Sequence, residues 1–418
     1  RSRFAALLGL LLPLAGAAGP ALAGGAWSPL AGWPLIAIHA VLMPDGRVLS
    51  YGTTQDGIQT GAFIYDIWDP RDGLDGGHLT LPNTTPTDLF CNAQLVLPQS
   101  GDILMTGGDV WNGSRTLNRG NSDSVILLAA TDQLTPGASM QQARWYGTMT
   151  TLANGEIYIQ GGKNRANQPS DRAEVRGTDG TFRLLADMDM SSFYWWYPRN
   201  WVAPDGRIFG YANRSMYFVD PRNGGMLSGV GSLPVGSVGI NSSGVMYAPG
   251  KILVCGGGNL TANTARDATA AAELIDITGP LPRVQATAPM PQALQWHTAT
   301  VLADGKVAVT GGALQNNQLV GVSSTAYLWD PATGTWTADA STLSGRARLY
   351  HSTALLLPDA SVLVAGGGAP GPQTNTNAEI YYPPYLFTAT GELAARPAIE
   401  QAPSELRPGT SRSEEHTS

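Results

Sequence analysis

Apolar residues recur along this chain in short runs separated by tight turns. The repeated unit is a polar or aromatic residue, an apolar strand, a turn of the Asp-Gly kind, a second apolar strand and a Gly-Gly pair. Copies begin at His39, Cys91, Tyr146, Tyr197, Gly244, Trp296 and Tyr350. A repeat period of about 40 to 55 residues is typical of propeller architectures. The pattern therefore predicts an all-β fold built from seven related units.

Each copy is predicted to start with a β-hairpin. The pairs Asp45-Gly46, Asn154-Gly155, Asp205-Gly206 and Asp304-Gly305 favour two-residue turns, because Asn, Asp and Gly tolerate positive φ. Further strands follow in AFIYDIWDP, TAYLWDP and AEIYYPPYLF, which would complete four-stranded blades. One blade cannot bury both faces of its sheet, so the blades must pack around an axis. We expect a seven-bladed, kelch-like β-propeller over residues 33–387.

The two ends of the chain depart from the repeat. Residues 1–23 combine Arg1 and Arg3, an apolar stretch and Ala21-Leu22-Ala23, the pattern of a secretory signal peptide. The apolar stretch is shorter than the roughly 20 residues of a membrane span, so we expect export without an anchor. Residues 388–411 indicate a linker and the start of a truncated further β domain. Residues 412–418, RSEEHTS, match a translated sequencing adapter, and we interpret them as an artefact.

Composition narrows the classes of function. The formal net charge is -7, and no Lys or Arg run accompanies it, so the electrostatic footprint of a nucleic-acid-binding protein is missing. The recurring carboxylates, such as Asp45 and Asp304, are explained by turn geometry and do not predict a glycosidase. Neither nucleic acid nor a membrane is an expected partner.

The candidate chemistry lies where the strands open. The first strand of every propeller blade lines the central channel, so residues that open these strands converge at one mouth. The residues with this offset from their turns are Cys91, Tyr146, Tyr197, Trp296, His297, Tyr350 and His351. Thiol, phenol and imidazole groups together suit a transition metal of the copper type. The spacing therefore predicts a metal site at the channel mouth.

Several of these residues also have a structural interpretation. Two cysteines in an exported chain suggest a disulfide, but Cys91 and Cys255 lie at opposite ends of their hairpins, too far apart for bridging. We expect His39 and His297 to be hydrogen-bonding residues rather than ligands. We interpret the aromatic run FYWWYPRN, residues 193–200, as packing between blades.

The ordered motifs FCNAQL, RWYGT, YPRNW and RLYHS resemble the galactose oxidase and glyoxal oxidase family. The resemblance implies a thioether between Cys91 and Tyr146, and one copper ion bound by Tyr146, Tyr350 and His351. It implies catalytic roles for Cys91, Tyr146 and Tyr350. It also implies that the domain after the propeller is a β-sandwich of the early-set, Ig-like kind that supplies a second histidine ligand. Residues 1–418 alone are therefore expected to be incomplete and inactive.

The resemblance further implies a secreted copper-radical oxidase. Its substrates would be primary alcohols, aldehydes or carbohydrate hydroxyls, with O2 as electron acceptor and hydrogen peroxide as product. In galactose oxidase a Trp from the loop after the crosslinked Tyr stacks on that Tyr, whereas the loop GGKNRANQPSDRAE holds no ring. Trp195 and Trp196 are the rings that would have to replace it. The alternative function is a non-enzymatic propeller that binds a glycan or a protein.

Overall fold

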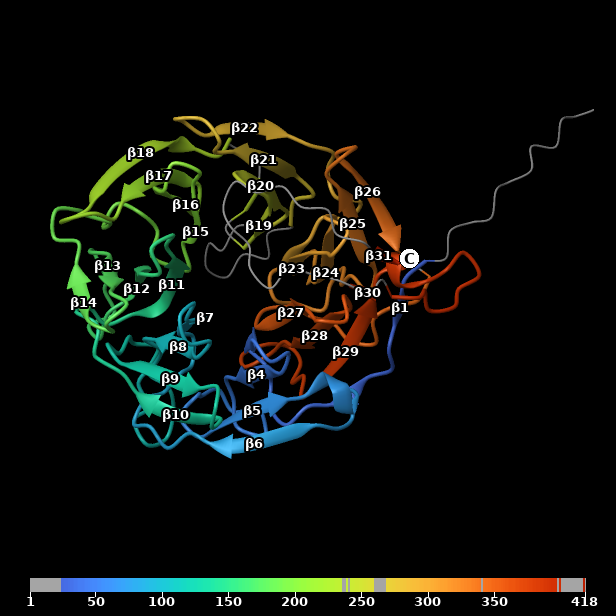
Figure 1. The fold of residues 1–418 in the computed structure, drawn as a ribbon, viewed down its shortest axis with the longest axis horizontal. Helices are drawn as coiled ribbons and strands as arrows, with labels where there is room; N and C mark the ends of the chain where they lie inside the picture. Colours follow the sequence, from blue (N-terminus) through green and yellow to red (C-terminus); the bar gives the residue numbers. More distant parts are fainter. Residues whose placement is uncertain are drawn as a thin grey trace, which may run out of the picture.

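The chain forms a closed ring of antiparallel sheets (Figure 1). The computed structural model describes residues 24–234, 238–239, 241–258, 268–339 and 341–396, and the backbone of 398–399 and 416–417. Seven sheets of four or five strands make up the ring in these residues, numbered here as blades 1 to 7 along the chain. The prediction of an all-β, seven-bladed propeller is confirmed. The predicted signal peptide, residues 1–23, lies outside the described residues.

The two innermost strands of each blade are the hairpin that the repeat predicts. From blade 1 to blade 7 they are β3 (His39–Leu42) and β4 (Val48–Tyr51), β7 (Ala93–Val96) and β8 (Ile103–Thr106), β11 (Trp145–Thr151) and β12 (Ile157–Lys163), β15 (Arg199–Val202) and β16 (Ile208–Ala212), β19 (Ser243–Ala248) and β20 (Lys251–Cys255), β23 (Gln295–Val301) and β24 (Val307–Ala313), and β27 (Ser352–Leu356) and β28 (Val362–Gly366). The turn glycines Gly46, Gly155 and Gly305 have φ of 89°, 84° and 83°, as the Asp-Gly and Asn-Gly pairs predict.

The outer strands complete each meander. From blade 1 to blade 6 they are β5 (Ile64–Trp68) and β6 (His78–Pro82), β9 (Ser124–Leu128) and β10 (Gln133–Pro136), β13 (Glu174–Arg176) and β14 (Phe182–Leu184), β17 (Ser215–Asp220) and β18 (Met226–Ser232), β21 (Ala272–Asp276) and β22 (Arg283–Ala286), and β25 (Ala326–Asp330) and β26 (Thr335–Asp339). Helix in the described residues is limited to the single turns η1 (Pro70–Asp72) and η2 (Pro384–Leu386), neither of them long or apolar enough to cross a membrane.

The last blade contains both ends of the ring. Its third strand, β29 (Asn377–Tyr382), pairs on its outer edge with β1 (Ala26–Trp27) and β2 (Ala31–Gly32) (Figure 1). The ring therefore begins before residue 33, where the repeat pattern had placed its start. Strands of two residues carry no periodicity, so the sequence pattern could not reveal them.

Little of the chain after the ring is described. Beyond η2, β30 (Ala398–Ile399) pairs antiparallel with β31 (His416–Thr417). The predicted start of a β-sandwich in residues 388–411 and the predicted artefact in 412–418 fall mostly outside the described residues, and both stay predictions.

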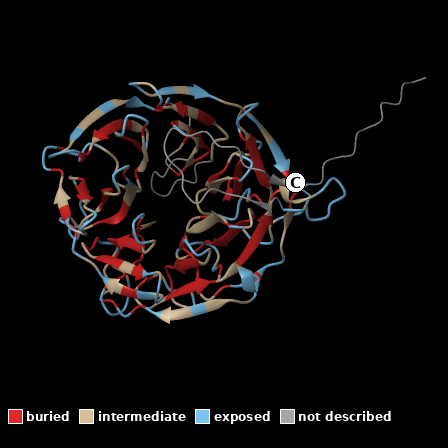
Figure 2. Ribbon diagram, in the orientation of Figure 1, coloured by how far each residue is buried: buried red, intermediate tan, exposed pale blue. Residues whose placement is uncertain are grey.

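The core is divided among the interfaces between neighbouring blades. Between blades 1 and 2, for example, Leu49 and Tyr65 pack against Ile103 and Met105, and all four are almost completely buried. Similar clusters fill the interfaces between the other neighbouring blades, and Figure 2 shows the buried strands all around the ring. Complete burial of such a side chain contributes roughly 1.5–3 kcal/mol. The interfaces therefore hold the blades together at a fixed angle.

The Gly-Gly pairs allow neighbouring blades to approach closely at the channel. Gly161, the first glycine of blade 3, has φ of 72°, and a Cβ on it would lie 2.6 Å from Cδ of Pro198 in blade 4. Only glycine fits such a position without strain. The close approach brings the starts of the innermost strands toward one another at one end of the ring.

Candidate metal centre

Five blades enter their innermost strand through a residue in the left-handed backbone region. These corner residues are Cys91, Tyr146, Tyr197, Trp296 and His351, with φ between 38° and 69°. This conformation is uncommon for residues with a Cβ and persists only where the surroundings hold it. Its recurrence in five blades indicates that the propeller imposes it. The corner is therefore the structural element that presents side chains at the channel mouth.

Backbone hydrogen bonds connect neighbouring corners. The backbone N–H of Tyr146 donates to the carbonyl oxygen of Cys91 over 2.9 Å, and that of Tyr197 donates to Tyr146 over 3.1 Å. The backbone N–H of Cys91 instead donates to Nε2 of His39 in blade 1, also over 3.1 Å. Blades 1 to 4 are thus joined at the mouth by a continuous series of bonds.

The four residues predicted to form the site lie together. The hydroxyls of Tyr146 and Tyr350 form a short hydrogen bond. Nε2 of His351 lies 3.8 Å from Sγ of Cys91, and the Cys91 thiol also interacts with the Tyr146 hydroxyl. Nδ1 of His351 lies 2.8 Å from the carbonyl oxygen of Gly368, which fixes the ring and leaves Nε2 directed into the site. Blades 2, 3 and 7 therefore contribute one cluster of a thiol, two phenols and an imidazole.

Burial keeps all four side chains neutral when no metal is bound. It raises the pKa of the Cys91 thiol, and it raises the pKa of the Tyr146 and Tyr350 phenols, with the nearby Cys91 adding to the effect on both. Burial lowers the pKa of His351 to about 4. A metal that binds the two phenols as phenolates must therefore release their protons, so its affinity should rise with pH.

The donor set fits a copper ion. One imidazole nitrogen and two phenol oxygens directed at one another are ligands that suit copper. In the part of the chain that the structure describes, no three His, Cys, Asp or Glu side chains gather to hold a metal, so a metal bound by this cluster would need the two phenols as ligands. The predicted second histidine ligand, expected from the domain after the propeller, stays a prediction.

The other two histidines near the channel have separate contacts. His39 accepts the Cys91 N–H, in agreement with the hydrogen-bonding role expected of it. Nε2 of His297 lies 3.6 Å from Sγ of Cys255. Cys91 and Cys255 are both free thiols, as expected from their positions in the repeat.

The run 193–200, interpreted from the sequence as packing between blades, does pack between blades 3 and 4, and its central residues contact the candidate site. Trp196 stacks on Tyr146, with ring centroids 5.3 Å apart and an interplanar angle of 27°, and Trp195 lies 5.9 Å from the same ring. On the other side, Trp296 lies 4.5 Å from Tyr350. These contacts join residues of different blades, so repeat spacing did not reveal them, although the family resemblance had named Trp195 and Trp196 as candidate neighbours of Tyr146. The signal that could have found Trp196 is its place directly before the corner residue Tyr197.

A buried ion pair lies behind each site tyrosine. Arg144, two residues before Tyr146, donates to Glu174 over 2.9 Å and to the carbonyl oxygen of Gly161 over 2.8 Å. Arg348, two residues before Tyr350, makes the same pair of contacts.

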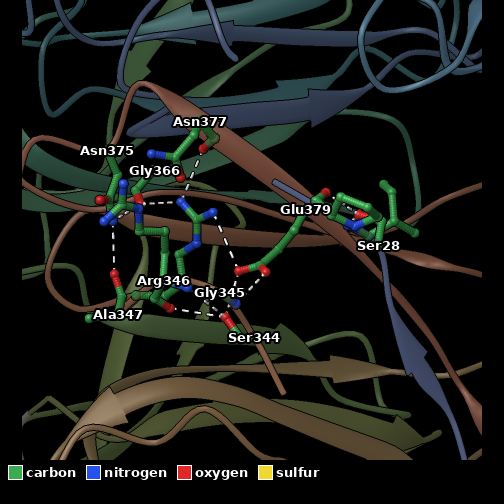
Figure 3. A network of polar contacts seen from close by, with 12 residues as sticks. Ser28, Ser344, Gly345, Arg346, Ala347, Gly366, Asn375, Asn377 and Glu379 are labelled. Atoms are coloured by element: carbon green, nitrogen blue, oxygen red, sulfur yellow. Dashed lines mark hydrogen bonds and ion pairs between the residues drawn. The ribbon is translucent and has the colours of Figure 1, made fainter. Parts of the chain in front are cut away.

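In blade 7 the contacts of Arg348 run to Glu379 over 3.5 Å and to the carbonyl oxygen of Gly366 over 3.0 Å. Figure 3 shows Glu379 also held by Ser344 and by the backbone N–H of Gly345. All four charged side chains of the two pairs are almost completely buried. Each tyrosine loop is therefore fastened to its own blade by a paired charge.

The cluster adjoins a cavity in the central channel. Its volume is about 410 Å³, and its lining includes His39, Gln94, Arg199, His297, Tyr350 and His351. Small molecules are usually bound in concave sites of this kind, with a few convergent polar groups.

Comparison with known proteins places this geometry in context. Residues 79–386, more than half of the chain, match the family described as Glyoxal oxidase N-terminus. The chain is 28% identical to a galactose oxidase of Gibberella zeae over 412 residues, which covers 90% of this chain and 57% of that protein. It is 26% identical to an aldehyde oxidase of Vitis pseudoreticulata over 351 residues, covering 77% of this chain and 65% of that protein. The chain thus spans less than two thirds of either relative.

The fold agrees with these similarities. A solved structure of a fungal alcohol oxidase of the AA5 family, in complex with copper, superposes with a TM-score of 0.77 at 25% sequence identity. The superposition covers 91% of this chain and 81% of that chain.

Proposed function

Because the chain belongs to the glyoxal oxidase family, we propose that it is the propeller of a secreted copper-dependent oxidase. Its substrate is a primary alcohol, an aldehyde or a carbohydrate hydroxyl, and O2 is reduced to hydrogen peroxide. The observation that carries the proposal is the convergence of Cys91, Tyr146, Tyr350 and His351 from three blades. Packing alone does not require a thiol, two phenols and an imidazole in one buried cluster.

Each side chain has a distinct role in this proposal. Tyr146, Tyr350 and the Nε2 atom of His351 would hold the copper, which would supply one-electron redox chemistry: the ion would accept one of the two substrate electrons and the oxidised Tyr146 ring the other, before both pass to O2. Tyr350 accepts the proton of the substrate hydroxyl. Tyr146, oxidised to a phenoxyl radical, takes the hydrogen atom from the substrate carbon. A thioether from Cys91 to the Tyr146 ring makes that ring easier to oxidise.

The surroundings of Tyr146 suit a stored radical. Trp196 covers one face of the ring, and Tyr197 approaches its edge with ring centroids 4.8 Å apart. Trp195 is in turn covered by the ammonium group of Lys163, 4.3 Å from the ring centroid. We infer that this aromatic layer excludes water from the oxidised ring.

Export follows from the same proposal and from the pattern of residues 1–23. Oxidation of external alcohols or carbohydrates, with release of hydrogen peroxide, suits an enzyme outside the cytoplasm. The non-enzymatic alternative, a propeller that binds a glycan or a protein, has no contact in the site that favours it over the oxidase.

The test is aerobic loading with Cu²⁺ of a protein that contains this propeller and the domain following it. We expect a mass loss of two hydrogen atoms, a digestion product joining the peptides of Cys91 and Tyr146, and peroxide production from a panel of primary alcohols, aldehydes and sugars. Tyr146→Phe should abolish both the link and the peroxide. Tyr158→Phe, which alters a buried phenol of the same blade whose hydroxyl bonds Gln160 rather than the cluster, is the matched control and should retain the link.

Two outcomes would reject the proposal. One is a protein that binds no copper although its fold is intact. The other is a copper-loaded protein that forms neither the 91–146 link nor peroxide with any substrate class, which would favour the binding propeller.

A further inference from the structure

Cys91 differs from the corner residues that follow it in how its backbone is held. The N–H groups of Tyr146 and Tyr197 each donate to the carbonyl oxygen of the preceding corner. The N–H of Cys91 donates to an imidazole nitrogen, Nε2 of His39, over 3.1 Å. At Cys91 the acceptor of the corner N–H is therefore a side chain, whereas at the next two corners it is a backbone carbonyl oxygen.

The Cys91 backbone needs such a partner. Its φ is 57°, in the left-handed region that residues with a Cβ adopt only when the surroundings determine it. Its N–H is also buried, and a buried N–H without an acceptor is unfavourable. Since φ sets the direction of the Cα–Cβ bond, the His39 contact also determines where the thiol points.

His39 is itself rigidly held. It is 7% exposed, and its ring stacks on Tyr51 with centroids 4.9 Å apart and an interplanar angle of 17°. Gln94 forms a side-chain hydrogen bond with it, and the Tyr51 hydroxyl donates to Asn92, the residue after Cys91, over 2.9 Å. Burial lowers the pKa of His39 to about 3, so the ring is neutral and Nε2 can accept. Blade 1 thus presents a fixed acceptor to the corner of blade 2.

We propose that His39 is a positioning residue that orients the Cys91 thiol toward the Tyr146 ring and thereby sets the rate at which the thioether forms. In that reaction a C–S bond replaces the thiol S–H and one ring C–H, and the two electrons and two protons pass to O2 as hydrogen peroxide. The rate effect rests on the proposed function. The contact between His39 and Cys91 does not.

Two substitutions separate positioning from packing. His39→Leu removes the acceptor while keeping an apolar side chain in place. His39→Gln keeps a side-chain oxygen near the position of Nε2. His297→Leu is the matched control, because His297 is a buried histidine on the innermost strand of blade 6 that contacts Cys255 rather than Cys91.

The first measurement is hydrogen exchange of the Cys91 amide in the copper-free chain. Loss of one buried hydrogen bond should accelerate exchange about tenfold in His39→Leu. The amide should exchange at the wild-type rate in His39→Gln and His297→Leu. Unchanged exchange in His39→Leu would overturn the positioning role, whatever the protein does with copper.

The second measurement is the rate of the two-hydrogen mass loss during aerobic copper loading, with thermal unfolding as a check on the fold. We expect a rate about tenfold lower in His39→Leu, recovery in His39→Gln and no change in His297→Leu. Equal rates of thioether formation in His39→Leu and wild type would show that His39 does not set this rate. If the wild type forms no link, the proposed cofactor fails, and the exchange experiment alone decides whether His39 holds Cys91.

Discussion

Blades 3 and 7 differ from blades 2 and 6 in the two side chains that pack behind the corner residue. In blades 3 and 7 the space is filled by the ion pairs Arg144–Glu174 and Arg348–Glu379. In blades 2 and 6 the corresponding positions are apolar or aromatic and buried. They are Leu89 with Val125 in blade 2, and Leu294 with Tyr327 in blade 6.

The positions correspond by their contacts and not only by their spacing. The carbonyl oxygens of Arg144, Leu294 and Arg348 each accept from the second glycine of the preceding blade. Glu174 and Glu379 each lie opposite the same point of the second strand in their blades, paired with Ile159 and Val364. Blades 2 and 6 show that a blade forms without the charges.

The difference indicates what the ion pairs contribute. A buried ion pair stabilises a fold little or not at all relative to well-packed apolar residues, because both charges lose their hydration. Its hydrogen bonds have fixed directions, whereas apolar contacts do not. The pairs occur in the blades that carry Tyr146 and Tyr350, so we interpret them as devices that orient the two tyrosine loops.

The largest effect is expected from breaking one pair. Glu379→Leu leaves the guanidinium of Arg348 buried without its counter-charge, which should cost about 3–5 kcal/mol of unfolding free energy. Urea unfolding of the variant and the wild type measures it. A cost below about 1 kcal/mol, the range of exposed pairs, would mean that water reaches Arg348.

A smaller effect is expected from truncating the apolar counterpart. Leu294→Ala removes a completely buried side chain in blade 6 and should cost about 2–4 kcal/mol through the cavity it leaves. The same unfolding experiment applies, with the exposed Leu343→Ala as the control that should change little. Equal results for the two leucines would show that blade 6 does not depend on packing at its corner.

Acid should destabilise the protein through the buried His297 of blade 6. Burial lowers the pKa of His297 in blade 6 to about 4 from 6.5, so the unfolded chain binds its proton first as pH falls. Stability from this group is complete above pH 6.5 and is lost as the pH falls toward 4. In copper-free protein, His297→Gln should reduce the loss of stability by about 1.4 kcal/mol per pH unit between roughly pH 6 and 5. An unchanged slope would show that His297 is protonated in the fold.

The smallest change in stability is expected from exchanging one kind of blade for the other. Arg348→Leu combined with Glu379→Val copies blade 2 and should alter the unfolding free energy by no more than about 1 kcal/mol. If the ion pair orients Tyr350 and His351, the affinity for Cu²⁺, measured by calorimetry, should nevertheless fall about tenfold. An unchanged affinity for Cu²⁺ would show that the ion pair does not orient Tyr350 and His351 and serves only the fold.

The parts of the molecule that the sequence predicted are those governed by local rules. The hairpins follow from turn pairs such as Asp45-Gly46, and the closed ring follows from counting them. The meeting of Cys91, Tyr146, Tyr350 and His351 follows from their shared place in the repeat. The features that the sequence did not predict depend on contacts between distant segments.

Trp196 is an example of a residue whose contacts could not be predicted fully from the sequence. Its position in an aromatic run predicts burial, and the family resemblance makes it a candidate neighbour of Tyr146, but the contact itself depends on the angle between blades 3 and 4. Arg144 directly precedes β11 and its partner Glu174 begins β13, and no local pattern distinguishes the two from surface charges before the register is known. Strands β1 and β2 have two residues each, too few to form a periodic pattern in the sequence.

The pairing of β1 and β2 with β29 acts as a clasp between the first and last segments of the ring. Gly25 donates to Asp339, and Trp27 donates to Thr342, so the clasp also reaches blade 6. The channel mouth takes its final shape only after the chain has been made as far as Tyr382 and its beginning has returned to meet it. Formation of the candidate metal centre would therefore depend on completion of the circle, because blade 7 provides both Tyr350 and His351.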